Sequence, residues 1–239
     1  EALRLSEERK LTFVSAFNDP WIVAGQGTIG LEFYEQNPDL DAVVVPVGGG
    51  GLIAGVALAL KTLIPKIRII GVQAEAVPSM KAALANGAPA QMPPATTIAD
   101  GIAVRAVGAT PFELVKSYVD EIVTVSEREI ANAVLLLLEI EKTVAEGAAA
   151  VPLAALINKK LSLASKNIGL IVSGGNIDMN LISRIIETGL IQDGRLGRFS
   201  IVISDRPGSL ARLAQRVADL GANILQISHS RGFGEMAIV

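Results

Sequence analysis

The chain has 239 residues, which suffices for one large domain or for a domain joined to a small module. Half of the residues are hydrophobic and 19% are charged, which excludes an intrinsically disordered chain. The formal net charge of −3 gives no electrostatic reason to expect nucleic acid or an anionic membrane as a partner. The chain has no cysteine, so disulfides and thiolate metal sites are excluded and a reducing cytoplasm is the expected compartment.

Residues 1–193 alternate apolar runs, typical of buried strands, with helical patterns. We expect strands at residues 11–17, 42–47, 67–73, 121–125 and 168–172. We expect helices starting near residue 20, at residues 52–63, 80–86, 111–119, 126–141 and 148–158, and after residue 176 to about residue 187. A strand, a loop, a helix and a strand follow one another between residues 42 and 73, which is a βαβ unit. The predicted fold class is therefore α/β, with a parallel sheet flanked by helices.

Two helix starts have specific capping signals. Asp19 is a plausible N-cap because Pro20 follows it at the first helical position. Ser126 is followed three residues later by Glu129, which is the pattern of a capping box.

Residues 42–60 carry no charge and are about long enough to span a bilayer. Pro46 and four successive glycines interrupt this stretch, and lipid would leave the broken backbone without hydrogen-bond partners. A buried strand, a glycine loop and a buried helix explain the stretch better, so no membrane span is expected.

The glycine-rich loop between the strand at 42–47 and the next helix is the strongest chemical feature. Its residues are Gly48, Gly49, Gly50, Gly51 and Leu52. Successive glycines leave backbone N–H groups free to surround an anion, and the helix that follows adds its N-terminal dipole. No Lys-Ser/Thr pair follows and no spaced dinucleotide-binding pattern is present, so a phosphate monoester fits best. A tight glycine turn without a ligand is the alternative.

A second loop of the same kind follows the strand at 168–172. It reads Ser173-Gly174-Gly175-Asn176 and precedes a helix. Alone it is equally compatible with a serine cap and a glycine turn. Open α/β sheets bind ligands at the carboxyl ends of their strands, so the two loops together predict one shared ligand.

The pattern changes after a linker at residues 192–194. We expect strands at 199–204, 224–230 and 235–239 and an amphipathic helix at 209–220 that Gly221 closes. This order is βαββ, a small α+β module. The sequence therefore predicts two domains, at residues 1–193 and 194–239.

Four segments of the first domain, in this order and at about this spacing, resemble the threonine dehydratase family. They are residues 19–28, 48–52, 97–101 and 173–176. The resemblance covers residues 1–193 and implies the three-layer fold of the fold-type II enzymes that use pyridoxal phosphate (PLP). It implies that the backbone of residues 48–52 holds the PLP phosphate and that Ser173 hydrogen-bonds the pyridine nitrogen. A serine at that position leaves the ring a weaker electron sink than a carboxylate would, which suits loss of a β-leaving group.

The implied reaction is dehydration and deamination of L-threonine to 2-oxobutanoate and ammonia, toward isoleucine. Serine dehydratase and serine racemase resemble the chain almost as well. A non-catalytic protein that binds an amino acid is the alternative from another class, because the family's cofactor-binding lysine and substrate loop lie in its N-terminal half and match nothing here. The lysines Lys61, Lys66, Lys159 and Lys160 are expected at the surface. We therefore assign no catalytic residue and expect a C-terminal fragment of a longer enzyme.

Some relatives bind a divalent cation near the end of the strand at 67–73. The matching ligand positions carry Gln73, which is not a carboxylate, and Ser79, with Glu75 two residues along, whereas a hard cation needs several oxygen ligands. No metal is expected. The single histidine, His229, is expected to be a surface or interface residue of the second module and not a catalyst.

Residues 199–239 resemble about two thirds of an ACT domain, a regulatory module that binds free amino acids. The matching stretches are Asp205-Arg206-Pro207-Gly208-Ser209-Leu210 and Gly221-Ala222-Asn223-Ile224. The resemblance implies that the first stretch lies near an amino-acid effector or a subunit contact, and that the protein forms homo-oligomers. A ferredoxin-like piece that only dimerises is the alternative.

Overall fold

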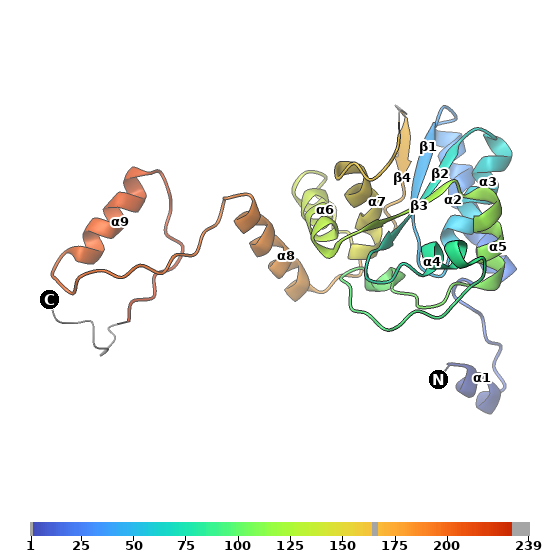
Figure 1. The fold of residues 1–239 in the computed structure, drawn as a ribbon, viewed down its shortest axis with the longest axis horizontal. Helices are drawn as coiled ribbons and strands as arrows, with labels where there is room; N and C mark the ends of the chain where they lie inside the picture. Colours follow the sequence, from blue (N-terminus) through green and yellow to red (C-terminus); the bar gives the residue numbers. More distant parts are fainter. Residues whose placement is uncertain (1, 164–166, 231–239) are drawn as a thin grey trace. The chain divides into compact units, whose positions relative to one another are not determined.

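The structure is a computed structural model that describes residues 2–163 and 167–230. The chain divides into two compact units, Glu1–Leu196 and Gly197–Val239. The first unit contains the sheet and most of the helices (Figure 1).

The first unit is built on a parallel sheet of four strands in the order β3-β2-β1-β4. The strands are β1 (Ala42–Pro46), β2 (Arg68–Ala74), β3 (Glu121–Val125) and β4 (Ile168–Leu170). Val44 of β1 aligns with Ile70 of β2 and Leu170 of β4, and Val72 aligns with Val123 of β3. The parallel α/β prediction is confirmed, and four of the five predicted strands form close to their predicted bounds.

Helices cover both faces of this sheet, which gives three layers (Figure 1). The helices of the unit are α1 (Ala2–Arg9), α2 (Pro20–Gln36), α3 (Gly51–Leu63), α4 (Ser79–Asn86), α5 (Ala109–Tyr118), α6 (Glu127–Glu139), α7 (Gly147–Ile157) and α8 (Met179–Gln192), with a 3₁₀ turn at Asp100–Ile102. Val43 and Val45 pack in a core with α3 and α5, whereas Val44 packs on the opposite face with α6 and α7. The two central strands, β1 and β2, are buried on both sides, which explains their continuous apolar sequences.

The predicted caps form. The Asp19 side chain accepts hydrogen bonds from the N–H groups of Trp21 and Ile22, at 2.8 and 3.4 Å. Ser126 and Glu129 make the reciprocal contacts of a capping box at the start of α6. Burial raises the pKa of the Glu129 carboxyl, but the Ser126 backbone N–H, the Lys160 ammonium and the Ser126 hydroxyl outweigh burial and hold this pKa below its usual value.

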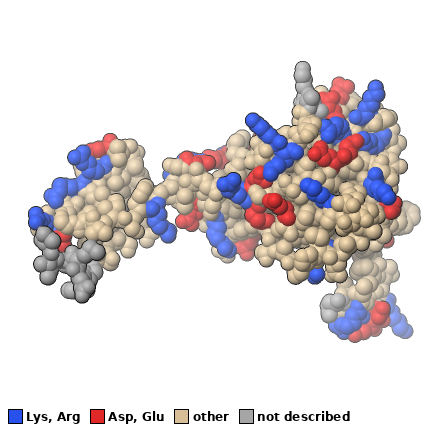
Figure 2. Space-filling model, in the orientation of Figure 1, with Lys and Arg blue, Asp and Glu red and all other residues tan. Residues whose placement is uncertain are grey.

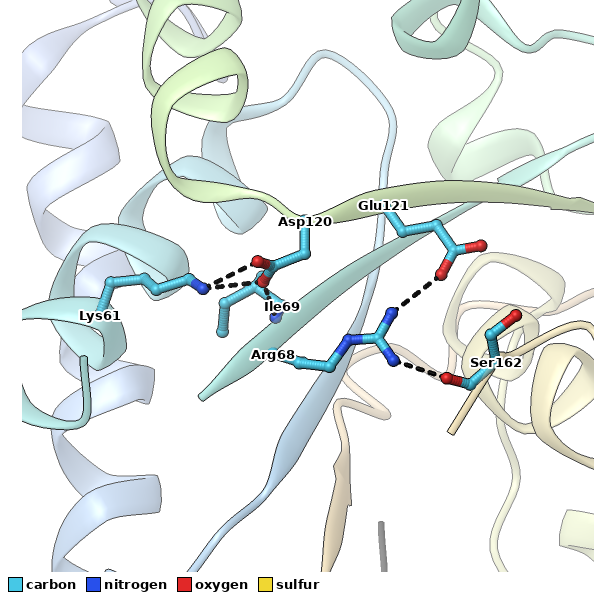
Figure 3. Close-up of polar contacts among 6 residues, drawn as sticks. All are labelled: Lys61, Arg68, Ile69, Asp120, Glu121 and Ser162. Carbon is cyan, nitrogen blue, oxygen red and sulfur yellow. Dashed lines mark hydrogen bonds and ion pairs between the residues drawn. The ribbon is translucent and has the colours of Figure 1, made fainter. Parts of the chain in front are cut away.

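Charged side chains join the amino ends of β2 and β3 to each other and to α3 (Figure 3). Asp120 pairs with Lys61 of α3 at 2.8 Å and accepts a hydrogen bond from the Ile69 N–H at 2.7 Å. Arg68 and Glu121 form a second pair between β2 and β3 at 3.2 Å. These contacts fix β3 and α3 to β2 at the end of the sheet opposite the glycine loop.

The predicted strand at residues 11–17 is wrong, because the segment has no regular structure. Leu11, Phe13 and Val14 are exposed instead of lying against a neighbouring strand. An alternating apolar pattern forms a strand only where a sheet edge is available to complete its hydrogen bonds. The segment ends at Phe17, which lies against the glycine loop.

The second unit contains helix α9 (Ser209–Asp219), which confirms the predicted helix apart from its last residue. The strands predicted at 199–204 and 224–230 do not form, and the one predicted at 235–239 lies outside the described residues. Phe199, Val202 and Leu225 are largely exposed, so these segments lack the packed partner that a strand needs. The predicted βαββ arrangement is therefore not present in the described part of this unit.

No helix in the described residues is long and apolar enough to cross a membrane. On the face shown in Figure 2, acidic and basic side chains are interspersed over the first unit.

Candidate functional site

The glycine loop leaves the carboxyl end of β1 and enters α3. Gly50 has φ of 98°, in the left-handed region that glycine adopts without strain, and it is the N-cap of α3. A Cβ atom at Gly49 would lie 2.3 Å from the Phe17 ring, and one at Gly50 would lie 2.6 Å from Met80. Neighbouring side chains therefore fill the space that larger residues in the loop would need.

A cavity of about 390 Å³ lies beside this loop. It is lined by Ala16, Phe17, Gln26, Pro46, Gly48, Gly49, Gly50, Gly51, Leu52, Gly101, Ile102, Val104, Glu146, Ala148, Ala149 and Ser173. All six predicted cofactor-binding residues, from the two separate loops, are thus brought to one cavity. It lies at the carboxyl ends of β1 and β4, where open α/β sheets place their ligands.

The cavity fits a phosphate monoester. Helix α3 has 13 residues, and its first turn contains no acidic side chain that would repel an anion. Glycines place backbone rather than side chains at its amino end, which is the arrangement that binds phosphate without a basic residue. The described residues that line the cavity include no lysine and no arginine, so the loop backbone is the group suited to this anion.

Glu146 is a cavity residue that sequence reasoning missed. Its carboxylate accepts a hydrogen bond from the Asn176 N–H at 3.0 Å, and its own N–H donates to the Gly174 carbonyl at 3.1 Å. These contacts tie the loop after Ser173 to the start of α7. The only local signal was an acidic residue directly before a glycine- and alanine-rich helix.

Phe17 and Gln26 also line the cavity and were not predicted as site residues. Both lie in or beside the segment that resembles the threonine dehydratase family at residues 19–28, so that segment was the available signal.

The four lysines expected at the surface lie away from the cavity lining. Lys61 pairs with Asp120, and Lys160 pairs with Glu129 at 3.1 Å. Lys66 lines a different hollow, near the amino end of β1.

Gln73 and Ser79, at the positions where some relatives bind a cation, hydrogen-bond to each other at 3.4 Å. In the described part of the chain, no group of three or more His, Cys, Asp or Glu side chains could hold a metal ion. His229 is exposed.

The six residues predicted to bind an effector form the turn and first residues of α9. Gly208 has φ of 83°, and the Ser209 hydroxyl accepts a hydrogen bond from the Arg212 guanidinium at 3.1 Å. The Ser204 and Ser209 hydroxyl oxygens are 3.2 Å apart. Asp205, Arg206 and Pro207 are exposed in this turn.

Residues 1–174 match the family model described as pyridoxal-phosphate dependent enzyme. The chain belongs to this family. The proteins that resemble it include L-threonine ammonia-lyase of Thermotoga maritima, 52% identical over 99% of this chain and 59% of the relative. The solved processed form of threonine deaminase isoform 2 from Solanum lycopersicum has a TM-score of 0.73 and 36% identity over 77% of this chain and 55% of that one. The solved serine racemase of Dictyostelium discoideum has a TM-score of 0.69 and 34% identity over 74% of this chain and 57% of that one.

The chain thus spans 59% of the length of the Thermotoga relative. The fold-type II, three-layer assignment is confirmed by the family match, by these structures and by the observed sheet.

Proposed function

We propose that the protein carrying this chain uses PLP to dehydrate and deaminate L-threonine, yielding 2-oxobutanoate and ammonia. The observation that carries the proposal is that residues 48–52 and Ser173 line one cavity at the carboxyl ends of β1 and β4. The 52% identity to a protein named L-threonine ammonia-lyase supports the choice of substrate.

The proposed roles follow from the chemistry of each group. When bound, PLP supplies an electron sink for reactions at the α-carbon of an amino acid. The N–H groups of residues 48–52 would hold its phosphate, and the Ser173 hydroxyl would hydrogen-bond its pyridine nitrogen. A neutral hydroxyl does not keep this nitrogen protonated as a carboxylate does, so the site favours loss of the substrate's β-hydroxyl group.

A keto-acid assay tests the reaction. The purified protein, supplied with PLP, should form 2-oxobutanoate from L-threonine faster than pyruvate from L-serine. Faster pyruvate formation, or racemised serine, would favour the alternative of a serine dehydratase or racemase, which the likeness to serine racemase supports.

A substitution tests the role of Ser173. Ser173→Asp should lower the ratio of elimination to side reactions such as racemisation, because the new carboxylate stabilises a protonated ring nitrogen. An unchanged ratio in a variant that still binds PLP would contradict this role.

A non-catalytic amino-acid-binding protein is a second candidate, since the described residues that line the cavity include no lysine to attach the cofactor. The visible absorption spectrum distinguishes the two. A cofactor band that changes when L-threonine is added, with keto acid forming, supports the enzyme. The absence of such a band with PLP in excess supports the binding protein.

For the second unit we propose regulation. The resemblance of residues 205–210 to an ACT loop is its support, and it also underlies the proposals of an amino-acid effector and a homo-oligomer. The proposed role toward isoleucine rests on the resemblance to threonine dehydratase, and the proposed cytoplasmic location rests on the absence of cysteine. Adding isoleucine to the keto-acid assay should change the rate, and Arg206→Ala should weaken that response. A rate that no amino acid alters would contradict regulation through this loop.

A further inference from the structure

A buried amide contacts the residue that directly precedes the glycine loop. Among the described residues, the buried polar side chains are Gln73, Ser79 and Ser209, and Gln73 is completely buried. Gln73 lies on β2, and its Nε2 group donates to the Val47 carbonyl at 3.2 Å and lies 3.4 Å from the Ser79 hydroxyl. Its Oε1 atom accepts a hydrogen bond from the Lys81 N–H at 2.9 Å. Both the nitrogen and the oxygen of this amide have hydrogen-bond partners, which a polar side chain needs when it is buried. An apolar residue could fill the same space without any partner, so the amide needs another explanation than packing.

Val47 joins β1 to the glycine loop, and β2 holds both of its backbone polar groups. The Val47 N–H donates to the Val72 carbonyl at 2.9 Å, and the Val47 carbonyl accepts from the next β2 residue, Gln73. The following peptide bond is planar and trans, so its carbonyl oxygen and the Gly48 N–H point in opposite directions. Holding the carbonyl toward Gln73 therefore fixes the direction of the first N–H in the loop.

We infer that Gln73 is a positioning residue for phosphate binding: through the Val47 carbonyl, it orients the Gly48 N–H and so the start of the anion-binding loop. This inference rests on the proposed function, which places the phosphate at residues 48–52. Loss of the Nε2 donor would leave a buried carbonyl unpaired, and the Val47–Gly48 peptide would be free to rotate. The loop would then meet a phosphate with one N–H less well aligned.

Pyridoxine 5′-phosphate and pyridoxine test this directly. They differ only in the phosphate, and neither carries an aldehyde that could react with a lysine. The ratio of their dissociation constants, measured by titration calorimetry, isolates the contribution of the phosphate. In the unmodified protein the phosphate ester should bind much more tightly. Equal affinities would contradict the proposed phosphate loop itself, independently of Gln73.

Gln73→Glu keeps the size of the side chain and an acceptor for the Lys81 N–H, but its carboxylate cannot donate to Val47. We expect the affinity ratio to fall by roughly tenfold, since one hydrogen bond to a charged group is involved. Pyridoxine itself should bind as before. If Gln73→Glu does not fold, Gln73→Asn, which is neutral and too short to reach the Val47 carbonyl, should give the same loss.

Two control variants distinguish positioning of the loop by Gln73 from a general loss of protein stability. Ser79→Ala leaves the bond to Val47 in place and should keep the ratio. Asp120→Ala breaks contacts at the opposite end of the sheet and should lower the melting temperature without changing the ratio (Figure 3). An unchanged ratio in both Gln73 variants, an equal loss for the two ligands, or the same fall in Asp120→Ala would overturn the inference.

Discussion

The crossing of α2 and α3 gives a sharp prediction about stability, because a glycine there touches backbone. A Cβ atom at Gly55 would lie 2.2 Å from the Val23 carbonyl oxygen and 2.7 Å from the Gly27 nitrogen. Both atoms belong to the backbone of α2, so no side-chain rotation relieves the contact in Gly55→Ala. Overpacking costs about 1–3 kcal/mol, and a backbone contact places the cost near the upper end of that range.

The higher helix propensity of alanine offsets about 1 kcal/mol of this cost. The net loss in the free energy of unfolding is about 2 kcal/mol, which corresponds to a fall of about 4–8 °C in melting temperature for a chain of this size. Circular dichroism during thermal and urea unfolding measures both quantities.

Gly25→Ala is the matched control on α2, since nothing lies within 4 Å of the added methyl group. It should raise the free energy of unfolding by about 0.5–1 kcal/mol through helix propensity alone. A Gly55→Ala protein as stable as the unmodified chain, or a Gly25→Ala protein that loses as much, would refute this packing of α2 on α3.

Three further predictions concern contacts elsewhere in the first unit. The pKa of the Glu129 carboxyl is lowered, so its stabilising contribution is present at neutral pH and is lost as the pH falls through the folded-state pKa. Glu129→Gln should therefore lower the free energy of unfolding by about 1 kcal/mol at pH 7 and should reduce the further loss of stability below about pH 5. If the free energies of unfolding of the variant and the unmodified protein fall with pH in parallel, this role of Glu129 is contradicted. Asp120→Ala should lower the free energy of unfolding, measured in urea, by about 1–3 kcal/mol, because the Ile69 N–H loses its hydrogen-bond partner. A change below about 0.5 kcal/mol, which is typical of surface substitutions, would count against this contact. Gly49→Ala should lower the free energy of unfolding by about 1–3 kcal/mol, because the added methyl group collides with the Phe17 ring. In a double-mutant cycle, Gly49→Ala and Phe17→Ala should be coupled by at least about 0.5 kcal/mol, and additive effects would contradict the contact.

The central βαβ unit and the starts of helices α2 and α6 were predictable because their signals are local. Continuous apolar runs mark β1 and β2, and the capping residues Asp19 and Ser126 fix the starts of two helices. The two loops that line the cavity were predictable for the same reason, since each combines small residues with the end of a buried strand.

The failures came where the deciding contacts are distant in the sequence. Residues 11–17 have the composition of a strand but no regular structure, and the segments predicted as strands on either side of α9 likewise have no regular structure. Glu146 meets Asn176 across thirty residues, and Gln73 meets Val47 across twenty-six, so neither role is visible in a local pattern. For Gln73, the sequence indicated only that a metal was not expected.

The most direct test of the proposed site is a crystal structure of the protein with pyridoxine 5′-phosphate bound. The proposal predicts the phosphate within hydrogen-bond distance of the N–H groups of residues 48–52 and the pyridine nitrogen beside the Ser173 hydroxyl. A phosphate bound elsewhere, or a ring whose nitrogen faces away from Ser173, would contradict the site on which the proposed function rests.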